Sequence, residues 1–245
     1  MSGPEQRRTR RLSVVVPVYN GARTVGPLVE RLHEHLASRY ELEVVLVNDG
    51  SPDDDSADVC RGLALRLPWV RFVDLARNFG EHNAVMAGLN HCSGDAAVIM
   101  DDDFQNPPAE VVKLVERLDE GYDVVFSRYE EKKHHPLRNL GSRFNDAVAN
   151  LVLDKHSDLY LSSFKALNRF LIDEIIRYPG PYPYVDGLIL RTTRHYATQT
   201  VEHVERQHGR SGYTARKLVR LWLAMFTNFS VLPLRIASFM GFAFA

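Results

Sequence analysis

The chain has 245 residues, of which 45% are hydrophobic and 25% are charged, and its formal net charge is −1. This length and apolar content suit one large domain or two small ones, and the balanced charge gives no global indication of nucleic-acid binding. The two cysteines are far apart and lack metal-ligand spacing, which suits a reducing compartment. Residues 1–11 are polar and basic without an apolar stretch, so they are no secretory signal and we expect them to be disordered.

The first half of the chain alternates between apolar runs typical of buried strands and segments with helical spacing. We expect strands at 12–18, 42–47, 70–75, 96–100 and 122–127, and helices at 25–36, after Ser51, at 84–89 and at 108–120. Ser51 and Pro52 have the chemistry of a helix cap and a first helical position. This order of elements predicts an α/β fold with parallel strands and right-handed crossovers.

Polar residues gather where these strands end, which is where open α/β sheets bind ligands. The predicted ends are 17–20, 48–51, 77–80, 101–105 and 127–128. No G-x-G-x-x-G motif follows the first strand and no Walker-type loop occurs, which argues against a nicotinamide dehydrogenase or a P-loop NTPase. A nucleotide could still bind, with its base held by loops and its diphosphate held by a metal ion.

The fourth strand end carries three adjacent carboxylates, Asp101, Asp102 and Asp103, before Gln105. Two carboxylates about 4 Å apart repel by roughly 4 kcal/mol at an effective dielectric constant of about 20, so water or a cation must offset the repulsion. Mg²⁺ and Mn²⁺ prefer such oxygen ligands and often bridge to phosphates. Strand alternation would place Asp101 and Asp103 on one side and Asp102 on the other. Taken alone, the stretch could also be an acidic loop that caps the next helix.

Four motifs occur in order along this half of the chain: Val16-Pro17-Val18-Tyr19-Asn20, Val47-Asn48-Asp49-Gly50-Ser51, Arg77-Asn78-Phe79-Gly80 and Asp101-Asp102-Asp103-Phe104-Gln105-Asn106-Pro107-Pro108. Together they resemble the family-2 glycosyltransferases of the GT-A fold. Within that family they resemble the polyprenyl-phosphate glycosyltransferases, which include dolichol-phosphate mannose synthase and bacterial undecaprenyl-phosphate glucosyl and aminoarabinosyl transferases. The resemblance covers about residues 12–235 and implies a Rossmann-like, mostly parallel sheet flanked by helices.

The resemblance implies a donor site for a nucleotide sugar, with UDP favoured over GDP or dTDP. Mg²⁺ or Mn²⁺ would be bound by Asp101, Asp103 and Gln105. The donor would contact residues of the strand-end loops and of a later R-x-x-G-x-S loop, namely Pro17, Tyr19, Asn20, Asp49, Asn78, Asp101, Asp102, Arg206, Arg210 and Ser211. Many relatives carry Glu where this chain has Gly21. On local chemistry alone, Tyr19 could be a strand-end aromatic and residues 48–51 a simple turn.

The resemblance also implies an acceptor site, in which Arg128, Arg138 and Ser142 match positions that bind the acceptor phosphate. Arginine suits this task because its guanidinium group binds phosphate oxygens with two parallel hydrogen bonds. Together with Asp103, these residues and Asp158 form the predicted catalytic set. Asp158 is a candidate base or sugar-orienting group, although a turn acid is an equal alternative. Asp186 could also reach the sugar, but Asp-Gly is equally good turn chemistry.

The C-terminal part of the chain has a different character. Residues 214–228 are amphipathic, with a basic side, and suit a helix in a membrane interface, although a core-packing helix has the same periodicity. Residues 229–245 carry one charge, Arg235, and are too few for a span of about 20 residues, so they read as the beginning of a transmembrane region in a truncated chain. We therefore expect a glycosyltransferase domain at 12–213, a juxtamembrane helix at 214–228 and a membrane segment after it.

The predicted reaction is sugar transfer from a nucleotide diphosphate to a polyprenyl phosphate at the cytoplasmic face of the inner membrane, with inversion implied by the resemblance. A homo-oligomer, such as a tetramer, is expected as in relatives, and nucleic acid is not an expected partner. One alternative is transfer to a glycan hydroxyl, but Trp69 and Trp222 lack the Q-x-x-R-W context of those relatives. Another is a non-catalytic, nucleotide-sugar-binding membrane scaffold.

Overall fold

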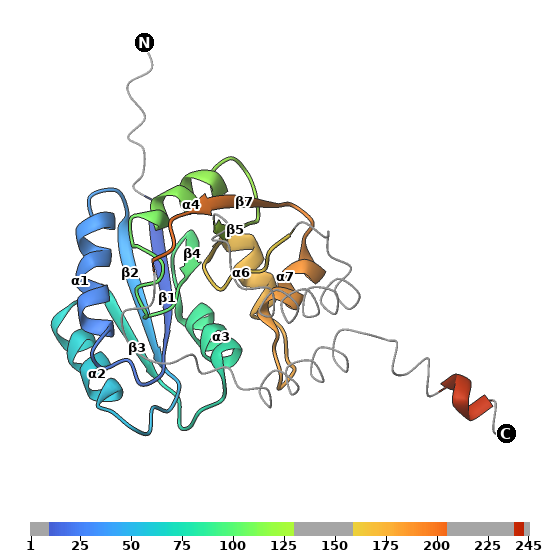
Figure 1. Cartoon of the computed structure of the whole chain (residues 1–245), viewed down its shortest axis with the longest axis horizontal. Coiled ribbons are helices and arrows are strands. Elements are labelled where there is room, and N and C mark those ends of the chain that lie inside the picture. Colours follow the sequence, from blue (N-terminus) through green and yellow to red (C-terminus); the bar gives the residue numbers. More distant parts are fainter. Residues whose placement is uncertain (1–9, 130–158, 205–237, 243–245) are drawn as a thin grey trace, which may run out of the picture.

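The computed structural model describes residues 10–129, 159–204 and 238–242, and every statement below concerns these residues. Seven strands form one sheet in the order β3-β2-β1-β4-β6-β5-β7, with helices packed on it as shown in Figure 1. The elements in chain order are β1 (Arg11–Val18), α1 (Val25–Leu36), β2 (Glu41–Asn48), α2 (Ser56–Arg66), β3 (Val70–Asp74), α3 (Glu81–His91), β4 (Ala96–Ile99), α4 (Glu110–Leu118), β5 (Val124–Tyr129), β6 (Lys165–Asn168), α6 (Arg169–Ile175), α7 (Val185–Thr192) and β7 (Tyr196–Val201).

The sheet is parallel except at β6, which runs antiparallel to both of its neighbours, β4 and β5. The C-terminal ends of the parallel strands therefore meet at one edge of the sheet. The N-terminal end of β6 lies at the same edge, since Lys165 pairs with Ile99 of β4. The prediction of an α/β fold with a mostly parallel sheet is confirmed, and the antiparallel β6 is the feature that the alternation of elements did not predict.

The core consists of two apolar layers, one on each face of the sheet, because successive strand residues point to opposite faces. From β1, Val14 and Val16 pack in the layer that contains buried residues of α1, α2 and α4. Val15 packs in the opposite layer with α3, α6 and α7. All three valines are fully buried, and each contributes roughly 1.5–3 kcal/mol of hydrophobic stabilisation.

The second helix begins later than the Ser51-Pro52 pair predicts, because α2 starts at Ser56. Ser51 instead closes a turn, in which its hydroxyl donates to Oδ1 of Asn48 at 2.6 Å. The same hydroxyl oxygen accepts a hydrogen bond from the backbone N–H of Asn20 at 3.0 Å. The serine therefore joins two strand-end loops, and its chemistry is used in a tertiary contact instead of a helix cap.

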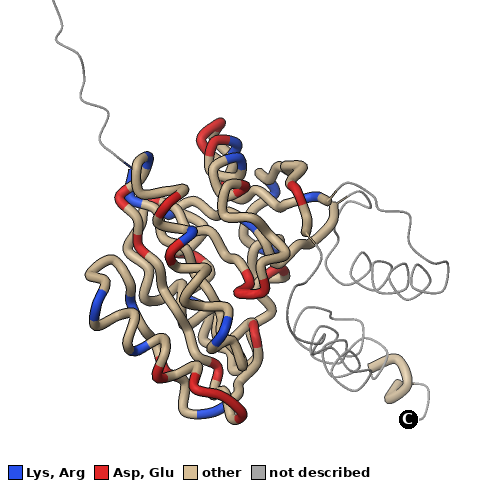
Figure 2. Tube along the Cα trace, turned by 60° about the vertical axis from the view of Figure 1, so that its left-hand side comes forward, with Lys and Arg blue, Asp and Glu red and all other residues tan. Residues whose placement is uncertain are grey.

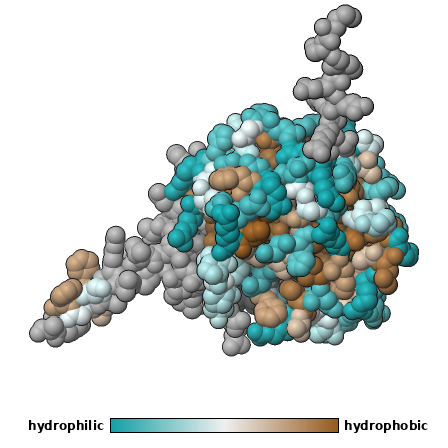
Figure 3. Space-filling view, turned by 180° about the vertical axis from the view of Figure 1, so that it is seen from behind, coloured by the Kyte–Doolittle hydropathy of each residue, from teal (hydrophilic) through white to brown (hydrophobic). Residues whose placement is uncertain are grey.

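Hydrophilic residues dominate the face of the molecule in Figure 3, with apolar residues in smaller groups between them. In Figure 2, acidic and basic residues alternate over the surface without dividing it into two charged halves. No helix in the described ranges is long and apolar enough to cross a membrane. The expected juxtamembrane helix at 214–228 lies outside these ranges, and residues 238–242 form a short helix.

Candidate functional site

The three carboxylates that follow β4 have three different hydrogen-bond partners. Oδ2 of Asp101 accepts a hydrogen bond from Oγ of Ser163, before β6, at 2.8 Å. Oδ2 of Asp102 accepts one from Oγ1 of Thr24, at the start of α1, at 3.1 Å. Oδ1 of Asp103 accepts one from the backbone N–H of Gln105 at 3.1 Å. The N-cap residue of α4 is Ala109, whose side chain makes no capping hydrogen bond.

Asp102 lies in an environment that strongly perturbs its carboxyl group. The pKa of its carboxyl group is raised to about 7, mainly by burial and also by the negative charges of Asp101 and Asp103, while the hydrogen bond from Thr24 acts in the opposite direction. Burial disfavours the charged form of the carboxyl group, and the two neighbouring acids add to this effect. A cation at this loop would offset that concentration of negative charge.

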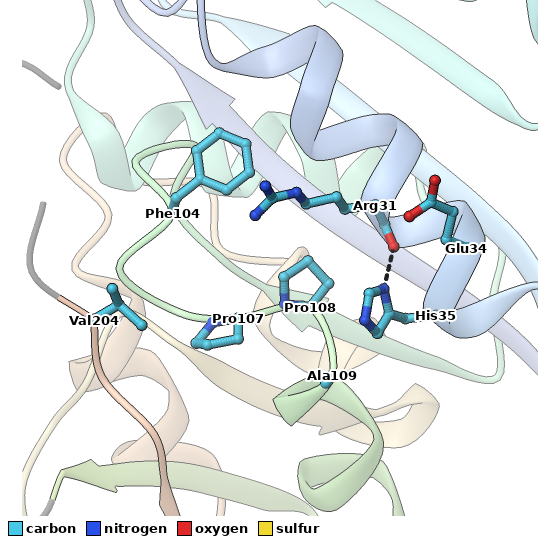
Figure 4. A pocket seen from close by; sticks show the side chains of 8 residues that line it. All are labelled: Arg31, Glu34, His35, Phe104, Pro107, Pro108, Ala109 and Val204. Carbon is cyan, nitrogen blue, oxygen red and sulfur yellow. Dashed lines mark hydrogen bonds between the residues drawn. The ribbon is translucent and has the colours of Figure 1, made fainter. Parts of the chain in front are cut away.

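Phe104, between Asp103 and Gln105, has a left-handed backbone with φ of +60°. This conformation is uncommon for a bulky residue and costs of the order of 1–3 kcal/mol. The ring of Phe104 faces α1, where the guanidinium carbon of Arg31 lies 5.0 Å from the ring centroid. Figure 4 shows the two side chains facing one another in a pocket of about 220 Å³ behind the acidic loop. The described lining of that pocket includes neither Asp103 nor Gln105.

Gln105 is oriented by a residue that follows β7. Nε2 of Gln105 lies 3.4 Å from Nε2 of His203, and because the amide nitrogen only donates, the imidazole nitrogen accepts. The amide oxygen of Gln105 then points away from His203. The ring of His203 packs 4.2 Å from that of Tyr129 at the end of β5, and the hydroxyl of Tyr129 donates to Oδ1 of Asn106 at 3.0 Å. Sequence reasoning missed both aromatic residues, whose only signal was their position at strand ends.

The donor atoms at this loop fit a hard divalent cation. Carboxylate oxygens of Asp101 and Asp103 and the amide oxygen of Gln105 are the ligand types that Mg²⁺ and Mn²⁺ prefer. Within the described residues, no group of three or more His, Cys, Asp or Glu side chains is placed to hold a metal ion. A cation here would therefore need further oxygens, and substrate phosphates commonly supply them.

The loops after β2 and β3 are fastened to one another by Asp49. Its carboxylate is 4% exposed and accepts hydrogen bonds from the backbone N–H groups of Phe79 at 2.7 Å and Gly80 at 3.0 Å. Gly50 has φ of +58°, and a Cβ atom there would lie 2.3 Å from the backbone carbon of Arg77. The sequence implied a nucleotide contact for Asp49, and the structure adds an organising contact between the two loops.

Tyr19 and Phe79 present exposed aromatic rings on two of these strand-end loops, with exposed fractions of 46% and 45%. The guanidinium carbon of Arg77 lies 4.5 Å from the ring centroid of Phe79. Asn20 and Asn78 are also exposed, and Pro17 is half-buried in β1. The predicted donor-contact residues before Asp101 therefore all lie at the edge where the parallel strands end.

The predicted acceptor residues are described only in part. Arg128 is exposed on β5 and pairs in register with Thr200 of β7, close to the same edge. The remaining predicted site residues lie outside the described ranges and are Arg138, Ser142, Asp158, Arg206, Arg210 and Ser211. The structure therefore brings Arg128 to the edge that carries the acidic loop and does not address the others.

A buried ion pair lies beside this edge, where Nζ of Lys165 contacts Oδ1 of Asp186 in the first turn of α7. The two residues are 3% and 7% exposed. His82 of α3 packs edge-on against Tyr184 with ring centroids 5.0 Å apart, and burial lowers the pKa of His82 to about 4. Asp186, considered above as a sugar contact, is thus engaged by a lysine that sequence reasoning missed. The available signal was a charged residue next to the apolar stretch of β6.

Comparison with known proteins identifies the family of this chain. Residues 13–176 match the family described as Glycosyl transferase family 2. An undecaprenyl-phosphate 4-deoxy-4-formamido-L-arabinose transferase from Pseudomonas savastanoi pv. phaseolicola is 33% identical over 243 residues, which cover 96% of this chain and 70% of the relative. The enzyme of the same name from Edwardsiella ictaluri is 34% identical over 246 residues, covering 96% and 74%.

Solved structures give an independent view of the fold. Glucosyl-3-phosphoglycerate synthase from Mycobacterium tuberculosis, in complex with Mn²⁺, uridine diphosphate and phosphoglyceric acid, superposes with a TM-score of 0.67 over 89% of this chain and 78% of that one. At 19% identity, this likeness shows the fold alone. The family match and the relatives above 30% identity agree with the four ordered motifs. The chain belongs to glycosyltransferase family 2, in the branch that contains the undecaprenyl-phosphate 4-deoxy-4-formamido-L-arabinose transferases.

Proposed function

We propose that this glycosyltransferase transfers a sugar from a nucleotide diphosphate, with UDP as the favoured nucleotide, to a polyprenyl phosphate. The main support for the proposal is that two sets of loops lie at the same edge of the sheet. One is the acidic loop, residues 101–105, and the other is the pair of loops after β2 and β3 that Asp49 joins. The acceptor class follows the names of the relatives, which act on undecaprenyl phosphate.

The donor half of the reaction depends on charge neutralisation. Asp101, Asp103 and the amide oxygen of Gln105 would hold Mg²⁺ or Mn²⁺, which stabilises the departing nucleoside diphosphate when bound. The structurally similar synthase was solved with Mn²⁺ and uridine diphosphate, which supports this choice of cofactor and nucleotide. The strand-end loops with Pro17, Tyr19, Asn20, Asp49 and Asn78 would hold the base and ribose, and Arg206, Arg210 and Ser211 complete the proposed donor-contact set.

The acceptor half depends on alignment more than on proton removal. A phosphate monoester has a second pKa of about 6, so at neutral pH it is already largely an oxyanion that can attack the anomeric carbon. Arg128, Arg138 and Ser142 would hold this phosphate in line with the bond that breaks. Asp158 would orient the donor sugar. Attack from the side opposite the leaving diphosphate gives inversion.

We place the reaction at the cytoplasmic face of the membrane, with residues 214–228 as an interface helix. The relatives name 4-deoxy-4-formamido-L-arabinose as the transferred sugar, so a UDP-linked aminoarabinose derivative is the first donor to test, and UDP-glucose the second. A homo-oligomer, such as a tetramer, belongs to the same proposal.

The test is a transfer assay with purified protein, radiolabelled UDP-sugars, Mg²⁺ or Mn²⁺, and undecaprenyl phosphate in detergent micelles. Label should enter the lipid fraction, and Asp103→Ala should reduce the rate by roughly 10²–10³-fold. Full activity of Asp103→Ala would contradict the metal role. Transfer to glycan hydroxyls in place of the lipid would contradict the proposed acceptor. Donor binding without turnover on any acceptor would favour a non-catalytic scaffold.

A second variant tests the acceptor site by itself. Arg128→Ala should raise the KM for the lipid phosphate and leave the KM for the donor close to wild type, because the guanidinium group is proposed to bind only the acceptor. Arg128→Lys keeps the charge without the two parallel hydrogen bonds, so its KM for the lipid phosphate should lie between those of wild type and Arg128→Ala. An increase in the donor KM alone would reassign Arg128 to the donor.

A further inference from the structure

Gly21 lies where the first strand-end loop turns into α1, and it has no room for a side chain. A Cβ atom built on Gly21 would lie 1.8 Å from Oδ2 of Asp102 and 3.0 Å from Cγ1 of Val18. Atoms cannot approach this closely, so a side chain at residue 21 and the carboxylate of Asp102 compete for one space. Gly26, in the first turn of α1, has nothing within 4 Å of its corresponding position.

The backbone at Gly21 is held on both sides, which decides what would move. Its N–H donates to Oγ of Ser56 at 2.8 Å. Its carbonyl oxygen accepts hydrogen bonds from the backbone N–H groups of Thr24 and Val25, both at 3.0 Å, and these open the first turn of α1. A retreat of residue 21 would break those three contacts. The carboxylate of Asp102 is therefore the group that any side chain at position 21 would displace.

We propose that Asp102 is a positioning residue that fastens the acidic loop to the start of α1, and that Gly21 is required because the carboxylate occupies the space of its side chain. The hydrogen bond from Thr24 and the packing over Gly21 hold the Asp102 carboxylate at the start of α1, whereas Asp101 bonds to Ser163 and Asp103 to the backbone of Gln105. Since Asp101 and Asp103 adjoin it in the chain, a shift of Asp102 shifts both proposed metal ligands.

This inference rests on the proposed function, because the loop that Asp102 fixes is the proposed metal–diphosphate site. Misplacement of a reacting group by about 1 Å can reduce a rate by about 10²-fold. The consequence is that Gly21→Ala, a change of one methyl group, should impair a site whose ligands are all intact.

The test is a double-variant cycle with Gly21→Ala, Asp102→Ala and the combination of the two, and Gly26→Ala as the matched control. Binding of UDP in the presence of Mn²⁺ is measured by calorimetry, and sugar transfer to undecaprenyl phosphate is measured in parallel. Circular dichroism and thermal unfolding verify that each variant folds. Asp102→Asn is added because it keeps the size and the acceptor for Thr24 but removes the charge.

Gly21→Ala should weaken Mn²⁺-dependent UDP binding at least 10-fold and lower turnover by about 10²-fold. Asp102→Ala should lower turnover less, by about 10-fold, because the loop loses its attachment to α1 but no side chain at residue 21 displaces it. The double variant should match Asp102→Ala within about twofold, since the methyl group no longer meets a carboxylate. Gly26→Ala should match wild type, and Asp102→Asn should retain more activity than Asp102→Ala.

Two results would overturn the inference. If Gly21→Ala is equally harmful with and without the Asp102 carboxylate, residue 21 matters for another reason. If Asp102→Asn is as impaired as Asp102→Ala, the charge itself acts on a ligand and Asp102 is not a positioning residue. If wild-type protein binds neither Mn²⁺ nor UDP, the proposed function is refuted, and Asp102 has no role in a donor site. This conclusion holds whatever coupling between residues 21 and 102 thermal unfolding reveals.

Discussion

Replacing Lys165 with methionine would remove the cation of the buried ion pair and leave the carboxylate of Asp186 inside the protein. The side chains of the pair are only 4% and 10% exposed, so water cannot take over the lost interaction. Breaking a buried pair from one side costs roughly 3–5 kcal/mol, because an uncompensated charge remains. Methionine keeps most of the length and apolar contact of the lysine stem, so the loss reports on the charge.

The assay is urea unfolding at pH 7.5, monitored by circular dichroism, for four proteins. The combination of Lys165→Met with Asp186→Leu removes both charges and should recover most of the lost stability, since apolar replacement of a whole buried pair is often neutral or favourable. As a matched control, Arg177→Met breaks the exposed pair with Glu174, where the arginine is 71% exposed, and should change stability by less than about 1 kcal/mol.

A free energy of unfolding for Lys165→Met within about 1 kcal/mol of the wild-type value would refute the reasoning, because an uncompensated buried carboxylate should destabilise the protein by more than this. The double variant also decides between two interpretations of Asp186. A stable double variant that keeps sugar transfer makes the pair purely structural. A stable double variant without transfer would restore Asp186 as a candidate contact of the donor sugar.

Three further outcomes follow from burial and packing. The pKa of His82 is about 4 in the folded protein and about 6.5 in the unfolded chain, so the neutral imidazole's contribution to the free energy of unfolding should be fully present above pH 6.5. That free energy should fall by about 2 kcal/mol at pH 5, and His82→Gln should remove this loss in pH-dependent unfolding. Burial raises the pKa of Cys60 to about 12 and also raises that of Cys92, so iodoacetamide at pH 8 should label neither in native protein and both in denaturant. Gly88→Ala should cost about 1–3 kcal/mol in urea unfolding, because its Cβ would lie 2.3 Å from Cγ1 of Val15, and Val15→Ala in the same chain should recover part of the loss.

The sequence predicted the parallel half of the fold well, because β1, β2 and β4 are mostly apolar runs that are buried on both faces. The predicted bounds of these strands agree with the structure to within one residue. Strand direction then brings the polar residues that follow them to one edge, which follows from the alternation of strands and helices alone. The fold class and the place of the candidate site could therefore be read from local patterns.

The antiparallel β6 could not be predicted in the same way. It has four residues, begins with a lysine, and is held by pairing with β4 and β5. Its direction is a property of those distant partners, and no local pattern encodes it. The late start of α2 has a similar cause. Ser51, which would otherwise cap the helix, bonds to Asn20, a residue 31 positions away in the chain.

Residue types at the candidate site were predictable, whereas their directions were not. Asp101 meets Ser163 across 62 positions, Asp102 meets Thr24 across 78, and Gln105 meets His203 across 98. A motif names the groups that chemistry needs, but in these three hydrogen bonds the partner comes from a remote segment. This is why three adjacent aspartates, equivalent in composition, acquire different environments.

These remote contacts also bear on how the acidic loop can act. A loop of charged residues at a strand end would normally sample many arrangements, and ordering it during binding would reduce affinity. Here α1, the segment before β6 and the end of β7 each hold one position of the loop. Ordering is thus completed on folding, as a preorganised electrostatic site requires. The carboxylate of Asp102, which bonds to Thr24 at the start of α1, is part of that attachment, and we infer that the motif depends on Gly21 as well as on its own acids.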